Sequence, residues 1–241
     1  METIVLLPPL AASGRTWRRQ VDELSGEFAV HAPELPGHGG SPGPFTFDRA
    51  VAEVAGLIDR TAGPVHLVGL SLSATVAVLA CLARPGRVGS LVLSGGIAAP
   101  PRALAVQRAI TGLLPAAVIA RMAARLLAPS LAGLPADERD RILAEASEDF
   151  RTAGRRTYLD GLRELARTDL RPSLGEVTAP TLVLCGSRDR LNVPGALELA
   201  DGIPHSRLRI VRGVGHLWHL EQPGLFSRTI GDLVRENQAR G

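Results

Sequence analysis

Lysine is absent from this sequence of 241 residues, so all 27 of its Lys-plus-Arg side chains are arginines. Arginine keeps its charge at any physiological pH, which explains a pI of about 9.6 beside a net charge of only +3. Without lysine, catalysis through a lysine Schiff base is excluded. The arginines are scattered among Asp and Glu rather than gathered in one stretch, so we expect no nucleic-acid partner.

Cysteines and aromatic residues are also scarce. Two cysteines, Cys81 and Cys185, are too few for a disulfide scaffold. Both lie in apolar runs, which predicts that they are small buried hydrophobic residues rather than reactive thiols. Aromatic residues make up only 3% of the chain, while hydrophobic residues make up 45%. The core is therefore expected to consist mainly of Ala, Val, Leu and Ile.

Signals for export, for a membrane and for bound metal are missing as well. The chain starts Met-Glu and its first apolar run is broken by Pro8-Pro9, so no signal peptide is expected. Arg and Pro interrupt the longest apolar stretch, residues 103–132, so it cannot span a bilayer. No residues have the spacing of a metal site or of a dinucleotide fingerprint. We expect a cytoplasmic protein without metal or cofactor that acts on a small molecule as a monomer or homodimer.

Short apolar runs alternate with longer helical patterns along much of the chain. Near-continuous apolar runs are typical of strands that are buried on both faces of a parallel sheet. Such strands separated by helices indicate βαβ units with right-handed crossovers. The sequence therefore predicts an α/β fold with a doubly wound, mainly parallel six-stranded sheet. The expected strands are Ile4–Leu7, Phe28–Ala32, Val65–Gly69, Ser90–Ser94, Thr181–Cys185 and Leu208–Val211.

One connection breaks this alternation. More than eighty residues separate Ser94 from Thr181 without a convincing strand, and connections of this length are usually functional insertions. We interpret residues 98–175 as a helical cap over one edge of a core formed by residues 1–97 and 176–241. Helical patterns in the cap lie near Ala103–Leu113, Ala116–Leu127, Ala136–Phe150 and Thr157–Thr168.

Ser71 stands at the junction of a buried strand and an apolar helix. The segment Gly69-Leu70-Ser71-Leu72-Ser73 has small residues on both sides of this serine. A sharp strand-to-helix turn would expose the hydroxyl above the sheet and aim the positive end of the helix at it. An ordinary turn with a serine cap would show the same local pattern. A catalytic role for Ser71 is therefore indicated only in combination with two further residues.

Asp189 and His216 each follow a separate predicted strand. Asp189 comes three residues after Gly186, which directly follows the expected strand Thr181–Cys185, and His216 ends the loop Gly213-Val214-Gly215-His216. The carboxyl ends of strands in a doubly wound sheet meet at one crevice. The chain order nucleophile, acid, base is the one that an α/β-hydrolase arrangement uses. Among the six histidines, His31, His38 and His66 fit structural roles better, and His219 is expected near the site.

This combination of residue types suits nucleophilic catalysis. A serine hydroxyl attacks at neutral pH only when a neutral imidazole removes its proton, which His216 would do. Asp189 would orient the imidazole and stabilise its charged form. The oxyanion of the tetrahedral intermediate needs backbone donors. The Leu72 N–H is one candidate, and the Leu10 N–H, in the loop after the first strand, is the other.

The whole chain resembles the α/β-hydrolase superfamily. Besides the three motifs above, similar segments are Glu34-Leu35-Pro36-Gly37-His38-Gly39-Gly40-Ser41 and Leu220-Glu221-Gln222-Pro223. The resemblance implies hydrolysis of an ester, lactone, thioester or C–C bond. Ser73 replaces the usual second glycine of the nucleophile turn, and Glu34 replaces a common Asp. Pro8-Pro9 stands where the family usually shows His-Gly, which affects the path of the loop, although Leu10 keeps its N–H.

The apolar cap favours a small, largely apolar acyl substrate. Residues expected to line the crevice are Trp17, Met122, Leu126 and Leu217. The main hypothesis is a serine hydrolase that cleaves a small ester or lactone through an acyl-enzyme. A biosynthetic lyase or cyclase, or a C–C bond hydrolase, that uses the triad for proton transfer is the first alternative. A binding module without catalytic activity is the second.

Overall fold

The computed structural model describes residues 1–239, apart from the side chains of Arg102, Ala103, Ala105 and Leu126. Its centre is a six-stranded sheet in which every strand pair is parallel, in the order β2-β1-β3-β4-β5-β6. The doubly wound sheet that the sequence predicts is therefore confirmed. The strands are β1 (Thr3–Leu7), β2 (Ala29–His31), β3 (Val65–Leu70), β4 (Val88–Ser94), β5 (Thr181–Gly186) and β6 (Ser206–Val211).

The inner strands are apolar because helices cover them on both sides. Every residue of β1, β3 and β5 is buried. The expectation of burial on both faces is wrong for the two edge strands, because β2 has no buried residue and only Val211 of β6 is buried. An edge strand has a neighbour on one side only, which leaves more of its residues open to solvent.

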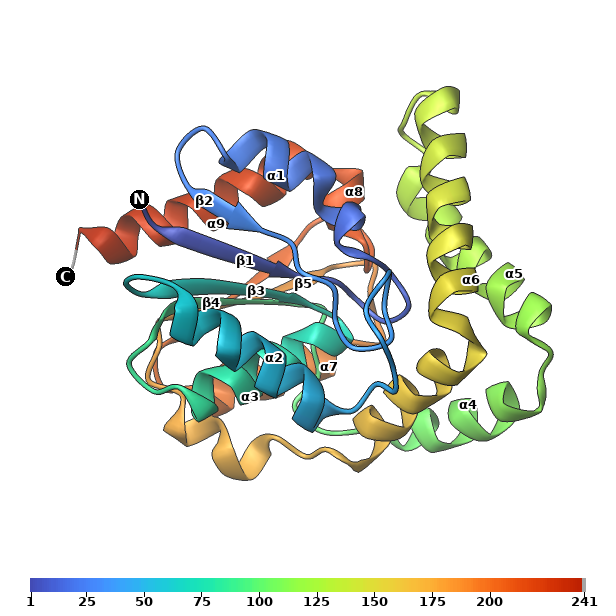
Figure 1. Ribbon diagram of the computed structural model, residues 1–241, viewed down its shortest axis with the longest axis horizontal. Helices are drawn as coiled ribbons and strands as arrows, with labels where there is room; N and C mark the ends of the chain where they lie inside the picture. The colour runs from blue at the N-terminus through green and yellow to red at the C-terminus, as the bar shows by residue number, and fades with distance from the viewer. Residues whose placement is uncertain (240–241) are drawn as a thin grey trace.

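Helices cover both faces of the sheet (Figure 1). On one face, Trp17, Trp218 and Phe226 pack against Ile4 and Leu70. On the other face, apolar side chains of α2, α3 and α7 pack against the sheet. The helices of the first face are α1 (Arg18–Leu24), α8 (Trp218–Glu221) and α9 (Pro223–Gln238). Those of the second face are α2 (Phe47–Arg60), α3 (Leu72–Ala83) and α7 (Val193–Gly202).

A separate group of helices lies beyond the carboxyl ends of the strands, where the strand arrows point in Figure 1. It consists of α4 (Arg102–Leu113), α5 (Ala116–Leu127), the 3-10 turn η2 (Ala128–Leu131) and α6 (Ala136–Arg167). The sequence predicts two helices where α6 runs. The structure joins them across a break at Gly154, whose φ of 73° is not helical. In the described part of the chain, no helix combines the length and the apolar character needed to cross a bilayer.

Candidate active site

Ser71 occupies the turn between β3 and α3. Its φ of 59° and ψ of −119° are strained for a residue with a side chain, as in a nucleophile elbow. The turn is held by backbone hydrogen bonds, because Ser71 N donates to Ser94 O at 2.8 Å and Ala74 N donates to Ser71 O at 3.1 Å. Backbone strain of this kind is typical of functional residues.

Ser73 holds this turn in place through the hydrogen bonds of its side chain. Its side chain is completely buried. The Ser73 hydroxyl accepts from Leu70 N at 2.9 Å and lies 2.8 Å from Leu7 O, to which it can donate. The serine that replaces the usual small glycine therefore joins the ends of β1 and β3 to the start of α3.

Asp189 and His216 are in direct contact at the ends of β5 and β6. His216 Nδ1 lies 2.6 Å from Asp189 Oδ2. The Asp189 side chain is 6% exposed and that of His216 is 32% exposed, so the imidazole has one face open. Arg188 N donates to Val214 O at 2.9 Å, which joins the two loops that carry this pair.

Glu221 and Gly95 fix the position of the imidazole. Glu221 Oε1 accepts from Gly215 N at 2.8 Å, directly before His216. Gly95 has a φ of +57°, and a Cβ there would lie 2.8 Å from both His216 Cε1 and His216 Nδ1. The imidazole therefore packs against bare backbone. The sequence interpretation rejected Gly95-Gly96 as a nucleotide fingerprint and assigned it no other role.

Ser71 and His216 line the same cavity. Within the residues that the structure describes, no hydrogen bond joins the two side chains, while the Nδ1 side of His216 is held by Asp189. Hydrogen bonds between catalytic groups are often long without substrate and shorten when it binds. The arrangement leaves His216 Nε2 available for the hydroxyl.

Leu10 and Leu72, the expected oxyanion donors, also line this cavity. Leu72 is the first residue of α3, where backbone N–H groups are free of helical partners. After Pro8-Pro9 the chain turns at once, with Ala12 N donating to Pro9 O at 3.2 Å. The residue that takes the left-handed conformation is Ala11, with a φ of 59°. Proline at positions 8 and 9 therefore does not prevent the loop from reaching the cavity.

The cavity has a volume of about 480 Å³. Leu217 lines it as expected. Most of the cavity wall is aliphatic or aromatic. Residues that form it include Leu10, Leu72, Ile97, Leu104, Phe150 and Leu162.

Two expected lining residues lie elsewhere. Trp17 is fully buried in the core, and its ring centroid lies 5.6 Å from that of Phe226. Met122 is 47% exposed, because α5 turns Ala120, Ala123 and Ala124 toward the cavity instead. Leu126 was also expected there, but its side chain lies outside the part that the structure describes.

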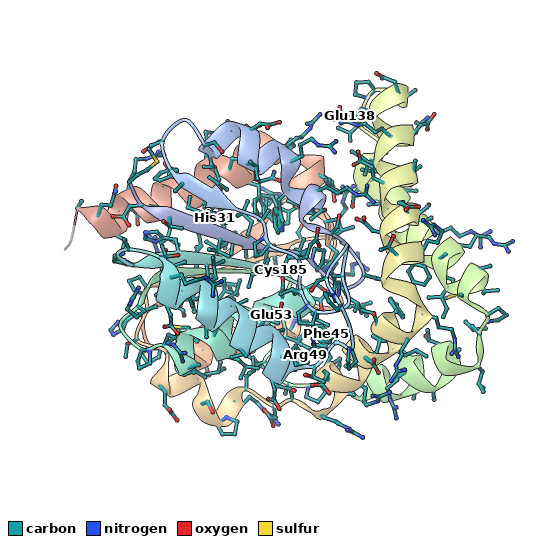
Figure 2. The ribbon with its side chains drawn as sticks, in the orientation of Figure 1. His31, Phe45, Arg49, Glu53, Glu138 and Cys185 are labelled. Atoms are coloured by element: carbon teal, nitrogen blue, oxygen red, sulfur yellow. The ribbon has the colours of Figure 1, made fainter. Side chains whose placement is uncertain are left out.

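Three ion pairs at the rim of the cavity connect the core to α6. Arg15, Arg18 and Arg19 come from the 3-10 turn η1 (Gly14–Trp17) and from α1. Their partners are Asp149, Glu145 and Glu138 of α6, in that order. Figure 2 shows Glu138 at the end of α6 that lies beside α1.

Asp149 is the most strongly held of these carboxylates. It is 5% exposed and accepts from Ser13 N and Ser13 Oγ, both at 2.9 Å, and from Arg15 Nε at 2.8 Å. The sequence interpretation described the arginines only as scattered among acidic residues. These three have defined partners on α6.

Asn192 is a site residue that the sequence interpretation missed. Its amide Nδ2 donates to Asp189 Oδ1 at 2.8 Å and to Asp189 Oδ2 at 3.0 Å. The same nitrogen lies 3.2 Å from His216 Nδ1. It stands three residues after Asp189 at the start of α7, which is a spacing that could have drawn attention to it.

Burial keeps two groups beside the site neutral. Burial, followed by the smaller effect of the charge of His216, lowers the pKa of His219 to about 3. Burial, followed by the smaller effect of the charge of Asp189, raises the pKa of Cys185 to about 12. Both cysteines are buried, as predicted. In the described residues, no three His, Cys, Asp or Glu side chains are grouped so that they could hold a metal ion.

The comparisons with known proteins point to one family. The model of the alpha/beta hydrolase family matches residues 4–229. A pimeloyl-[acyl-carrier protein] methyl ester esterase of Methylococcus capsulatus is 34% identical over 219 residues, covering 86% of this chain and 83% of that protein. The 3-oxoadipate enol-lactonase 2 of Acinetobacter baylyi is 25% identical over 229 residues, covering 91% of this chain and 83% of that protein.

A solved structure agrees with the family model at the level of the fold. An esterase from Exiguobacterium antarcticum superposes with a TM-score of 0.84 at 18% identity, covering 98% of this chain and 92% of that one. The match of the family model extends over nearly the whole chain and includes the nucleophile turn and the loops after β5 and β6. The chain therefore belongs to the alpha/beta hydrolase family and, as its sequence predicts, is a hydrolase of that fold.

Proposed function

We propose that the protein cleaves small, largely apolar carboxylic esters or lactones, with Ser71 as nucleophile, His216 as general base and Asp189 as the partner of His216. The observation that carries the proposal is the 2.6 Å contact between His216 Nδ1 and Asp189 Oδ2 at the edge of the cavity that Ser71 lines. An imidazole held in this way has Nε2 free to take a proton.

The reaction would proceed in two halves. His216 Nε2 removes the hydroxyl proton as Ser71 Oγ attacks the carbonyl carbon, and the carbonyl oxygen becomes an oxyanion. The N–H groups of Leu72 and Leu10 would donate to it. His216 then returns the proton to the leaving alcohol as the acyl-enzyme forms. Water attacks the acyl-enzyme by the same route, which releases the acid and restores the Ser71 hydroxyl.

The lining of the cavity and the relatives support this substrate class. Most of the cavity wall is aliphatic or aromatic, which suits an apolar acyl group. Relatives that cover most of this chain are named as a methyl ester esterase and an enol-lactonase. A cytoplasmic location, a monomeric or homodimeric state, and the division into a core and a cap at residues 98–175 stay predictions of the sequence.

A fluorophosphonate probe tests the nucleophile. We expect stoichiometric labelling of the wild-type protein, with the adduct on Ser71 in a peptide map. Ser71→Ala should lose both the label and the turnover of p-nitrophenyl esters. Ser147→Ala is the matched control, because Ser147 also lines the cavity but donates to Leu143 O at 2.8 Å in its own helix.

Two results would contradict the proposal. One is a folded wild-type protein that takes no label and hydrolyses neither p-nitrophenyl esters nor lactones. The other is Ser71→Ala protein that is labelled as completely as Ser147→Ala protein. Asp189→Asn should keep the label site but lower kcat by roughly 10³–10⁴-fold, because the imidazole would lose its orienting carboxylate.

A further inference from the structure

Thr16 brings a hydroxyl group to the wall of the cavity. It belongs to η1 and lines the cavity. Thr16 Oγ1 is 3.2 Å from His219 Nε2. Within the described residues this is the only side-chain hydrogen bond of the hydroxyl. The Thr16 hydroxyl is therefore hydrogen-bonded to the buried His219, and Thr16 also borders the cavity.

His219 is a rigid and uncharged partner. Its side chain is completely buried, and its ring centroid lies 4.8 Å from that of Trp17 and 6.0 Å from that of Phe226. Burial lowers the pKa of His219 to about 3, so the imidazole is neutral at physiological pH. A neutral imidazole carries one proton, on either Nδ1 or Nε2.

The surroundings decide which nitrogen carries that proton. His219 Nδ1 is buried without a hydrogen-bond partner among the described residues. A buried N–H without an acceptor is rarer and more costly than an unused acceptor. The proton therefore belongs on Nε2, and His219 Nε2–H donates to Thr16 Oγ1.

This tautomer sets the direction of the Thr16 hydroxyl. With His219 as the donor, Thr16 Oγ1 acts as an acceptor on its buried side, and its own proton is free to point into the cavity. Leu217 and Leu220, which also line the cavity, carry no side-chain acceptor. The carboxylates that line it, Glu138, Glu145 and Asp149, are paired with arginines. A substrate oxygen that comes within reach would accept this proton.

We propose that Thr16 is a specificity residue that donates a hydrogen bond to a second oxygen of the substrate, and that His219 is the positioning residue that aims it. The preferred substrates are esters or lactones that carry an oxo, ether or carboxylate oxygen away from the scissile bond. This inference rests on the proposed function. The apolar cavity wall selects for an apolar chain, and Thr16 selects for one acceptor placed along it.

A series of matched esters tests the inference. The probes are p-nitrophenyl hexanoate and its 3-oxo, 4-oxo and 5-oxo analogues. For the wild type, kcat/KM for at least one oxo ester should exceed that for hexanoate by about two- to tenfold, as expected for one hydrogen bond. Thr16→Val, which has the same shape but no hydroxyl, should lower that ratio by about the same factor. Thr16→Ser should retain it.

Because both kcat/KM values come from one protein preparation, their ratio does not depend on the amount of active enzyme. His219→Phe, which keeps an aromatic ring beside Trp17, should also lower the ratio because nothing then orients the hydroxyl. A wild type that prefers no oxo ester, or a Thr16→Val variant that keeps the preference, overturns the inference while the proposed function stands. Failure of the proposed function would differ, because the wild type would then hydrolyse no ester and take no fluorophosphonate label.

Discussion

Gly161 of α6 lies so close to Leu10 that a Cβ at position 161 would be 2.4 Å from Leu10 Cδ1. The same Cβ would be 2.9 Å from Leu72 Cδ1. Helix α6 thus rests on the two residues whose N–H groups we propose as oxyanion donors. Only hydrogen at position 161 allows this approach.

Gly161→Ala should therefore lower kcat more than it raises KM. The added methyl group must displace the Cδ atoms of Leu10 and Leu72, and a shift that passes to their backbone N–H groups weakens the hydrogen bonds to the oxyanion. We expect a decrease in kcat of roughly tenfold. Gly112→Ala is the matched control in α4, because nothing lies within 4 Å of a Cβ there. Equal steady-state parameters for the two variants would contradict the coupling between α6 and the oxyanion donors.

Asn192→Ala should lower kcat by about tenfold with little effect on KM. The variant loses both amide hydrogen bonds to Asp189, at 2.8 and 3.0 Å, so the carboxylate that orients His216 is less well fixed. Arg190→Ala, on an exposed neighbour in the same loop, should keep wild-type kcat. The interpretation would be wrong if kcat of the Asn192→Ala protein equalled that of the Arg190→Ala protein.

The rim ion pairs should differ strongly in their effect on stability. Asp149→Ala leaves the buried N–H and hydroxyl of Ser13 and the Arg15 guanidinium without their acceptor. We expect the free energy of unfolding to fall by about 2–4 kcal/mol.

Glu145→Ala removes the more exposed pair with Arg18, whose atoms are 3.0 Å apart, and should cost less than about 1 kcal/mol. Urea unfolding of both variants measures the difference. Similar losses in the two proteins would contradict the distinction between buried and exposed pairs.

His219 should make the protein less stable at acidic pH. Burial lowers the pKa of His219 in the folded protein to about 3, from its ordinary value of 6.5. Between these values the unfolded chain binds more protons than the folded one, so the free energy of unfolding decreases as pH falls.

Between pH 6.5 and pH 4.5, His219 lowers the free energy of unfolding by about 2 kcal/mol, at 1.36 kcal/mol for each pH unit. His219→Phe removes it, and urea unfolding at several pH values should show a shallower acid decline than in the wild type. His38 and His66, whose pKa values burial also lowers, are unchanged in the variant and contribute equally to both curves. Parallel curves for the two proteins would refute this assignment.

The sequence predicts well the features that depend on short stretches of chain. The apolar run of β3 followed by the apolar helix α3 is enough to indicate the turn at Ser71. The ends of β5 and β6 likewise indicate that Asp189 and His216 meet, because parallel strands end at one edge of a sheet. These features follow from local patterns and from the topology that the patterns impose.

Features that depend on the rotation of a helix or on distant contacts were not predicted. Trp17 and Met122 are large and apolar, but whether such a side chain faces the core, the cavity or solvent depends on how its helix is turned. The contact between Thr16 and His219 joins residues 203 positions apart, which no local pattern can indicate.

The break at Gly154 divides α6 into two parts, both of which line the cavity and contact the rest of the chain. Glu138, Glu145 and Asp149 precede it and attach the helix to the core. Leu162 and Leu165 follow it and line the cavity. Substitutions at Leu162 or Leu165 can therefore change the length or shape of the acyl group accepted while the three ion pairs before the break stay intact. An evolving enzyme of this type could change its substrate range through these two positions while α6 keeps its attachment to η1 and α1.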